Sequence, residues 1–95
     1  MAAYVIINVT VSDDDAYQAY RDAVSSNIMA FGGSYVVRAG TVEVLEGKHD
    51  GSQLVILMFP TLGQAKRWWK SPEYAEIKKL RKGTAKLDVF VVDGT

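Results

Sequence analysis

The 95-residue chain contains no cysteine and a single histidine. It can form no disulfide, and it has no thiolate to act as a nucleophile or a metal ligand. Basic and acidic residues number 11 each, so the basic excess typical of nucleic-acid-binding proteins is missing. Apolar runs are all shorter than the roughly 20 residues of a membrane-spanning helix. We therefore expect no metal or other cofactor, no nucleic-acid partner and no membrane partner.

Length and composition suit one ordinary globular domain over residues 1–95. Hydrophobic residues make up 48% and charged residues 23% of the chain, far from the composition of disordered proteins. The first residues, Met1 to Tyr4, run straight into a strand-like pattern without signal-peptide architecture. The predicted location is the cytoplasm. Lysines and arginines crowd residues 66–86, and we interpret them as a solvated helix surface.

Periodicity and end signals predict four strands and three helical segments. Runs of β-branched and aromatic residues predict strands at 3–10, 34–46, 53–59 and 86–93. The second is either one long strand or a strand bent at Gly40, where a bulge is expected. A helix over about 13–30 is predicted to be capped by Ser12 and ended by Gly32-Gly33, with one of these glycines at positive φ.

The segment from Trp68 to Tyr74 predicts a helix break. Thr61 and Gln64 have capping-box spacing, so a helix is expected from there to about residue 70. Ser71 can cap a further helix over about 72–82, because proline suits the first helical position. The two tryptophans and Tyr74 should form one aromatic cluster, either a core anchor or a pocket wall.

The order β-α-β-β-α-β predicts an α+β, ferredoxin-like sandwich with an antiparallel sheet. The turn at Asp50-Gly51 makes its flanking strands antiparallel. Strands 53–59 and 86–93 are apolar on both faces, yet helices of this topology cover only one face. An uncovered apolar sheet face normally marks an interface. We therefore predict a homodimer in which two sheets stack as an α/β barrel.

An ordered set of short motifs carries a family resemblance. They are Tyr17-x-x-Tyr20, Phe31-Gly32-Gly33, Arg38-x-Gly40, Leu45-Glu46-Gly47, Phe59-Pro60, Ala65-x-x-Trp68, Ser71-Pro72-Glu73-Tyr74 and Leu80-Arg81. The chain resembles domain-of-unknown-function family 1330 of the dimeric α/β-barrel superfamily. This resemblance implies a ferredoxin-like protomer that pairs through its sheet, and it implies no particular reaction. The wider superfamily includes cofactor-independent monooxygenases, isomerases of small ring compounds and haem enzymes.

Four residues are candidate ligand contacts: Tyr20, Arg38, Trp68 and Tyr74. Strict alternation places Arg38 on the apolar face of its strand, where a guanidinium needs an acceptor, either a ligand or an ion-pair partner. Tyr20 lies on the buried stripe of its helix and either has one hydrogen-bond partner or touches a ligand. Asn8 marks either a polar spot in a cavity or a satisfied core amide. The lone His49 lies in a turn and is expected to be solvated rather than a haem or metal ligand.

The leading hypothesis is a homodimer that binds a small organic molecule in a pocket between helices and sheet. Its first rival is a non-catalytic structural or interaction dimer whose barrel is filled by side chains. A cofactor-independent monooxygenase or isomerase ranks third. A ligand site should offer a cavity of roughly 300 Å³ or more with convergent polar groups.

Overall fold

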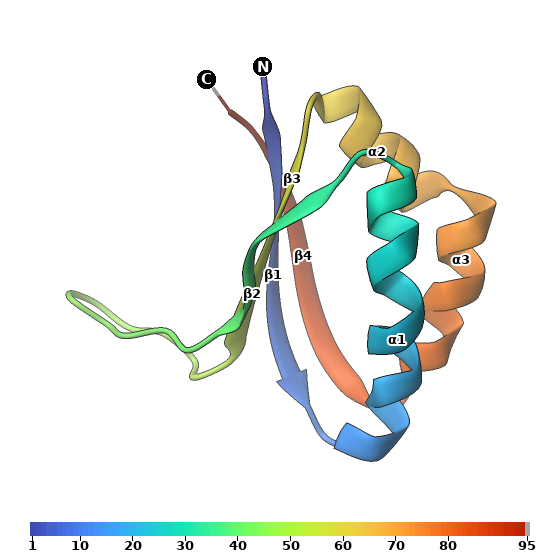
Figure 1. Cartoon of the computed structure of the whole chain (residues 1–95). Helices are drawn as coiled ribbons and strands as arrows, with labels where there is room; N and C mark the ends of the chain where they lie inside the picture. Colours follow the sequence, from blue (N-terminus) through green and yellow to red (C-terminus); the bar gives the residue numbers. More distant parts are fainter. Residues whose placement is uncertain (95) are drawn as a thin grey trace.

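Four antiparallel strands form one sheet, and all the helices lie against one of its faces (Figure 1). The computed structural model describes residues 1–94. The elements in chain order are β1 (Ala3–Val11), α1 (Asp14–Ala30), β2 (Ser34–Gly40), β3 (Gln53–Phe59), α2 (Leu62–Lys70), α3 (Pro72–Lys78), the 3₁₀ turn η1 (Lys79–Arg81) and β4 (Ala85–Asp93). The strand order β2-β3-β1-β4 is the predicted ferredoxin-like arrangement, with β1 and β3 in the centre. Within residues 1–94, no helix is long and apolar enough to cross a membrane.

The ends of α1 follow local chemistry, with one correction. Asp13, not Ser12, caps the helix, and its carboxylate accepts a hydrogen bond from the Ala16 N–H at 3.1 Å. The Ser12 hydroxyl instead donates to the Thr84 carbonyl at 3.0 Å, which ties the end of β1 to the start of β4. At the other end Gly32 has φ +86°, as expected for a glycine helix stop.

Gly33 meets a different constraint, which the sequence does not reveal. A Cβ at this position would lie 2.7 Å from carbon atoms of both Ile28 and Phe59. Both of these side chains are buried in the core. The backbone at Gly33 therefore packs directly against α1 and β3, and no larger residue fits there without displacing them.

The helix break occurs where it was predicted. The Thr61 hydroxyl accepts from the Gln64 N–H at 3.1 Å and starts α2. The Ser71 hydroxyl donates to the Trp68 carbonyl at 2.8 Å and accepts from the Tyr74 N–H at 3.1 Å. One side chain thus closes α2 and opens α3.

Strand β2 is shorter and less regular than predicted. It ends at Gly40, and residues 41–52 form an arm that projects from the sheet (Figure 1) rather than a continued strand to residue 46. The pairing with β3 shifts register between Tyr35 and Val37 and again between Val37 and Gly40, so each shift adds one unpaired residue to β2. Ala39, inside the second bulge, adopts φ +57°.

The two faces of the sheet have different surroundings. Alternate side chains of the central strand β1 pack against the helices in the core, namely Ala3, Val5, Ile7 and Val9. The opposite face presents apolar side chains on all four strands: Tyr4, Ile6, Val37, Leu54, Ile56, Met58, Phe90 and Val92. Phe90 is 54% exposed. No helix within residues 1–94 covers this face (Figure 1), which we call the outer face.

Candidate functional site

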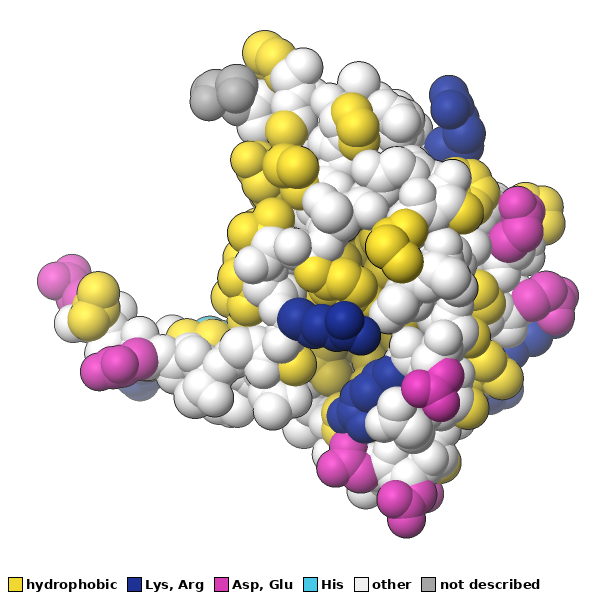
Figure 2. Space-filling model, viewed as in Figure 1, with side chains coloured by type: hydrophobic (Ala, Val, Ile, Leu, Met, Phe, Trp, Pro, Cys, Tyr) yellow, Lys and Arg dark blue, Asp and Glu magenta, His cyan; other side chains and the backbone are white. Residues whose placement is uncertain are grey.

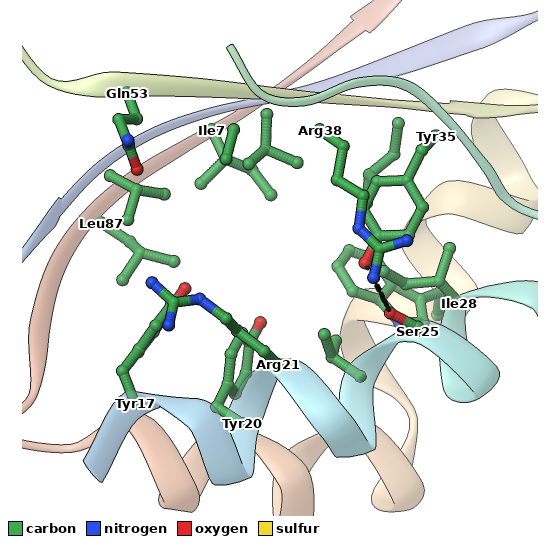
Figure 3. Close-up of a pocket in the computed structure, with 16 residues that line it drawn as sticks. Ile7, Tyr17, Tyr20, Arg21, Ser25, Ile28, Tyr35, Arg38, Gln53 and Leu87 are labelled. Carbon is green, nitrogen blue, oxygen red and sulfur yellow. Dashed lines mark hydrogen bonds between the residues drawn. The ribbon is translucent and has the colours of Figure 1, made fainter. Parts of the chain in front are cut away.

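A cavity of about 130 Å³ lies between α1 and the inner face of the sheet. Its wall is largely apolar: Ile7, Val24, Ile28, Val55, Leu57 and Leu87. Polar groups enter from α1, β2 and β3, and Figure 3 shows the labelled side chains pointing toward the open space. In Figure 2, basic side chains stand beside a hollow with a hydrophobic floor between the strands and α1. The volume is below the roughly 300 Å³ typical of drug-sized ligands.

Arg38 lines this cavity from β2, as predicted, but it does not share a face with Val36. Strict alternation would group it with Val36, but the bulge after Tyr35 returns Arg38 to the inner face. Its guanidinium lies over the Tyr35 ring, 4.7 Å from the centroid, and donates to the Ser25 hydroxyl at 3.2 Å. Within residues 1–94 it forms no salt bridge. The expected ion-pair alternative has no carboxylate partner in this part of the chain.

Arg21 is a second positively charged residue that lines the cavity, and it was not among the residues predicted from the sequence. It follows the buried Tyr20 on α1, and its guanidinium lies 4.7 Å from the centroid of the Tyr17 ring. Its terminal nitrogens donate to Asp14 at 2.8 Å and to Gln18 at 3.2 Å. The signal available in the sequence is the i, i+4 spacing of Tyr17 and Arg21, which places a cation beside a ring on one helix face.

Tyr20 lines the cavity, whereas Tyr74 does not. Tyr74 is buried behind it, and the two hydroxyl oxygens are 2.9 Å apart in a hydrogen bond. Burial, followed by the proximity and hydrogen bond of Tyr74, raises the pKa of Tyr20 far above its ordinary value. Burial also raises the pKa of Tyr17. The Tyr17 and Tyr20 phenols are therefore neutral at physiological pH.

Trp68 forms part of the cavity wall and of the aromatic cluster predicted at the helix break. Its indole N–H donates to the buried Asn27 side chain at 2.8 Å. Its ring centroid is 4.4 Å from that of Tyr74 and 6.0 Å from that of Trp69. The cluster is thus both core anchor and pocket wall, because one edge of Trp68 borders the cavity. Three of the four candidate residues, Tyr20, Arg38 and Trp68, meet at this site.

The remaining polar candidates lie elsewhere. Asn8 is on the outer face, neither in a cavity nor in the core, and its amide oxygen is 3.4 Å from both the His49 ring and the Ser52 hydroxyl. The His49 side chain is 25% exposed, so it is more enclosed than expected. In residues 1–94, no three His, Cys, Asp or Glu side chains gather in a way that could hold a metal ion.

The described lining of the cavity offers apolar contacts and hydrogen-bond donors. It includes no aspartate, glutamate, histidine or cysteine. Burial holds the Tyr17 and Tyr20 phenols neutral, and guanidinium groups do not lose protons in proteins. The lining can therefore hold an apolar body and donate hydrogen bonds to oxygen atoms.

Solved structures with this fold include proteins of unknown function and one enzyme. RPA0582, a protein of unknown function from Rhodopseudomonas palustris, has a TM-score of 0.74 at 18% identity, covering 99% of this chain and 82% of its own. A dimeric ferredoxin-like protein of unknown function from Jannaschia sp. CCS1 has a TM-score of 0.65 at 9% identity, covering 99% and 100%. SnoaB, a cofactor-independent oxygenase from Streptomyces nogalater, has a TM-score of 0.61 at 13% identity, covering 99% and 93%. Identities this low show a shared fold.

Sequence comparison identifies the family. No curated protein sequence matches the chain significantly. The family described as Domain of unknown function (DUF1330) matches residues 2–95, which is nearly the whole chain. This protein therefore belongs to the DUF1330 family.

Proposed function

We propose that the protein is a homodimer that binds a small organic molecule in the cavity between α1 and the sheet. The observation that carries this proposal is the composition of the cavity, an apolar chamber into which Arg21, Arg38 and Tyr20 bring hydrogen-bond donors. Apolar walls with a few convergent polar groups are typical of small-molecule sites. Tyr74 supports this site by holding the Tyr20 hydroxyl from behind.

The uncovered outer face supports the homodimer. Ile56 pairs with Ile6 on β1 and Val37 on β2, so apolar side chains lie next to one another across neighbouring strands. Figure 2 shows hydrophobic side chains gathered along the margin where Figure 1 places the strands. Contiguous apolar patches of several hundred Å² are rare on monomers and common at interfaces. A dimeric protein among the structures of similar fold adds support for the same assembly.

Light scattering on two matched variants tests the dimer. Ile56→Arg introduces a charge at the centre of the outer face and should yield a monomer or an aggregate, because an unpaired charge in an apolar interface is strongly unfavourable. Leu80→Arg makes the same change at a 44% exposed leucine on η1 and should leave the dimer intact. A monomeric unmodified protein at micromolar concentration would contradict the proposal.

Native mass spectrometry of the purified protein tests ligand binding. We expect a non-covalent adduct that leaves on collisional activation, and a rise in thermal midpoint when ring-sized compounds are added. A bare dimer mass, together with an unchanged midpoint across such compounds, would favour the rival interpretation of a dimer filled by its own side chains. The cavity volume of about 130 Å³ is the observation in favour of this rival, because it is below the roughly 300 Å³ typical of drug-sized ligands.

A catalytic role is the third candidate and rests on fold alone. SnoaB, which shares the fold, is a cofactor-independent oxygenase. Similar folds carry many unrelated activities, so this likeness assigns no reaction to the chain. The described cavity residues include no side chain suited to act as a base at neutral pH, which favours binding over acid–base catalysis. Oxygen consumption by the protein in the presence of a ring compound would favour the interpretation as an oxygenase.

A further inference from the structure

The polar lining of the cavity is positively charged. Arg21 and Arg38 both line it, and the described lining residues include no carboxylate. Arg21 comes from the helix wall and Arg38 from the strand wall, and Figure 3 shows the two guanidinium groups on opposite sides of one open space, Arg21 beside Tyr17 and Arg38 beside Ser25. Burial keeps Tyr17 and Tyr20 protonated, so no phenolate offsets these charges at neutral pH.

Each guanidinium is held in place by a tyrosine ring. Arg21 stacks on Tyr17 and Arg38 on Tyr35, with 4.7 Å from guanidinium carbon to ring centroid in both pairs. Stacking covers one face of the planar guanidinium, so a ligand can meet the N–H groups along its edge that have no other partner. Arg21 already donates from its two terminal nitrogens to Asp14 and Gln18, which leaves three of its five N–H groups. Arg38 uses one edge for the neutral Ser25 hydroxyl, and Arg21 has a single carboxylate partner, Asp14, whose side chain is 78% exposed.

An exposed carboxylate competes weakly with a ligand. Surface ion pairs contribute little free energy, since water and salt screen both charges. The Asp14 contact can therefore be exchanged for a ligand oxyanion at small cost. Arg38 has no such competitor among residues 1–94.

The volume limits the rest of the ligand. An apolar cavity of about 150 Å³ accommodates a benzene molecule. The cavity here, at about 130 Å³ and open to one side, matches a body the size of a single ring. Its apolar walls, which include Leu57 and Trp68, offer that body no hydrogen bonds except at the polar edge.

We propose that the ligand is a small organic anion whose oxyanion is attracted to the polar edge of the cavity by the charges of Arg21 and Arg38, and whose ring-sized apolar body lies in the cavity against the partly buried Val55 and Leu87. This inference rests on the proposed binding function and specifies its ligand class. A carboxylate or a phosphate satisfies the same chemistry, because guanidinium groups bind both through paired N–H donors. The neutral amide of the same shape lacks the charge and should bind less well.

Isothermal titration with matched probes tests the charge preference. Benzoate, phenyl phosphate and the neutral benzamide have the same ring and differ in the head group. At low ionic strength we expect benzoate or phenyl phosphate to bind at least about tenfold more tightly than benzamide, and the tighter of the two identifies the anionic head. Raising the salt concentration should reduce the ratio of anion affinity to benzamide affinity, because salt screens charges near the opening of the cavity.

Arginine variants connect the preference to these side chains. Arg38→Met and Arg21→Met should each reduce the anion preference several-fold while benzamide affinity stays within about twofold. Arg67→Met removes an exposed arginine on α2, which does not line the cavity, and should change neither affinity. Circular dichroism spectra that match the unmodified protein establish that each variant folds.

Three results would overturn the inference, and they differ in what they say of the binding function. Equal affinity for benzoate, phenyl phosphate and benzamide would reject the anion preference while leaving a small-molecule site in place. An anion preference that survives in the Arg21→Met, Arg38→Met double variant would reject these two residues as its source. Failure of all three probes to bind at millimolar concentration would reject both the inference and the ring-sized site.

Discussion

Replacing Arg38 by methionine separates a ligand-facing guanidinium from a structural ion pair. The structure gives this arginine two modest contacts, a hydrogen bond to Ser25 at 3.2 Å and the Tyr35 ring at 4.7 Å. A cation–π contact at an exposed site contributes about 0.5–1 kcal/mol, and a hydrogen bond to a neutral, accessible hydroxyl about 0.5 kcal/mol. Methionine keeps a similar stem and a sulfur–aromatic contact with Tyr35, which recovers part of this loss.

The expected loss of stability is therefore about 1 kcal/mol. For a chain of this size that corresponds to a fall in thermal midpoint of about 4–8 °C. A buried ion pair would respond differently, because removing one partner leaves an unpaired charge and costs about 3–5 kcal/mol. We would compare the thermal midpoints of Arg38→Met and the unmodified protein by differential scanning calorimetry at one fixed protein concentration. Arg67→Met serves as the control for the loss of a positive charge. A fall of more than about 12 °C for Arg38→Met alone would refute the reasoning and establish a structural ion pair.

Three further variants test the packing and the protonation described above. Gly33→Ala should lower the free energy of unfolding by about 2–3 kcal/mol in urea denaturation, because its Cβ would lie 2.7 Å from two buried side chains. Gly32→Ala, at φ +86°, should cost about 1 kcal/mol, mainly from backbone strain, because the nearest atom to its Cβ is the end of the flexible Gln64 side chain at 3.0 Å. Equal effects of the two would contradict this distinction. Asn27→Ala should cost about 1–3 kcal/mol, since it removes the acceptor 2.8 Å from the Trp68 indole N–H; an unchanged urea midpoint would show that another group accepts this bond. The folded state raises the pKa of Tyr20 above its ordinary 10.0, so the unfolded chain releases that proton first and stability should fall above about pH 10. Tyr20→Phe should flatten this decline in urea midpoints between pH 8 and 11, and an identical decline in the variant would assign it to other groups.

Features governed by neighbouring residues were predictable from the sequence. The bounds of β3, the stop at Gly32 and the break at Ser71 each follow from side chains within a few positions, and the structure confirms them. The start of α1 was displaced by one residue, because Ser12 and Asp13 are both competent caps and only the Thr84 carbonyl, from a distant part of the chain, occupies Ser12.

Features governed by pairing between strands were not predictable. Gly40 indicated a bend and a bulge, and the second register shift does lie just before it. Alternation in the sequence continues past Gly40, however, whereas the arm from residue 41 leaves the sheet altogether. The grouping of Arg38 with Val36 on one face was wrong because a bulge depends on the pairing of two strands. Tyr20 and Trp68 were selected because large aromatic residues on the apolar stripe of a helix are conspicuous, and Arg38 because it interrupts an apolar strand. Arg21 was missed because it lies beside the apolar stripe of α1, not on it.

The bulges in β2 also bear on how much the length of this strand can vary. Val36 is the additional residue between Tyr35 and Val37, so a chain lacking it would pair with β3 by regular alternation as far as the second bulge. In that shorter chain Tyr35 and Arg38 would still project to the same side, and the stacked pair at the cavity would survive the deletion. Inserting one residue would instead turn the arginine to the opposite side. Relatives can therefore lose a residue here without losing the site, whereas a gained residue requires a further bulge.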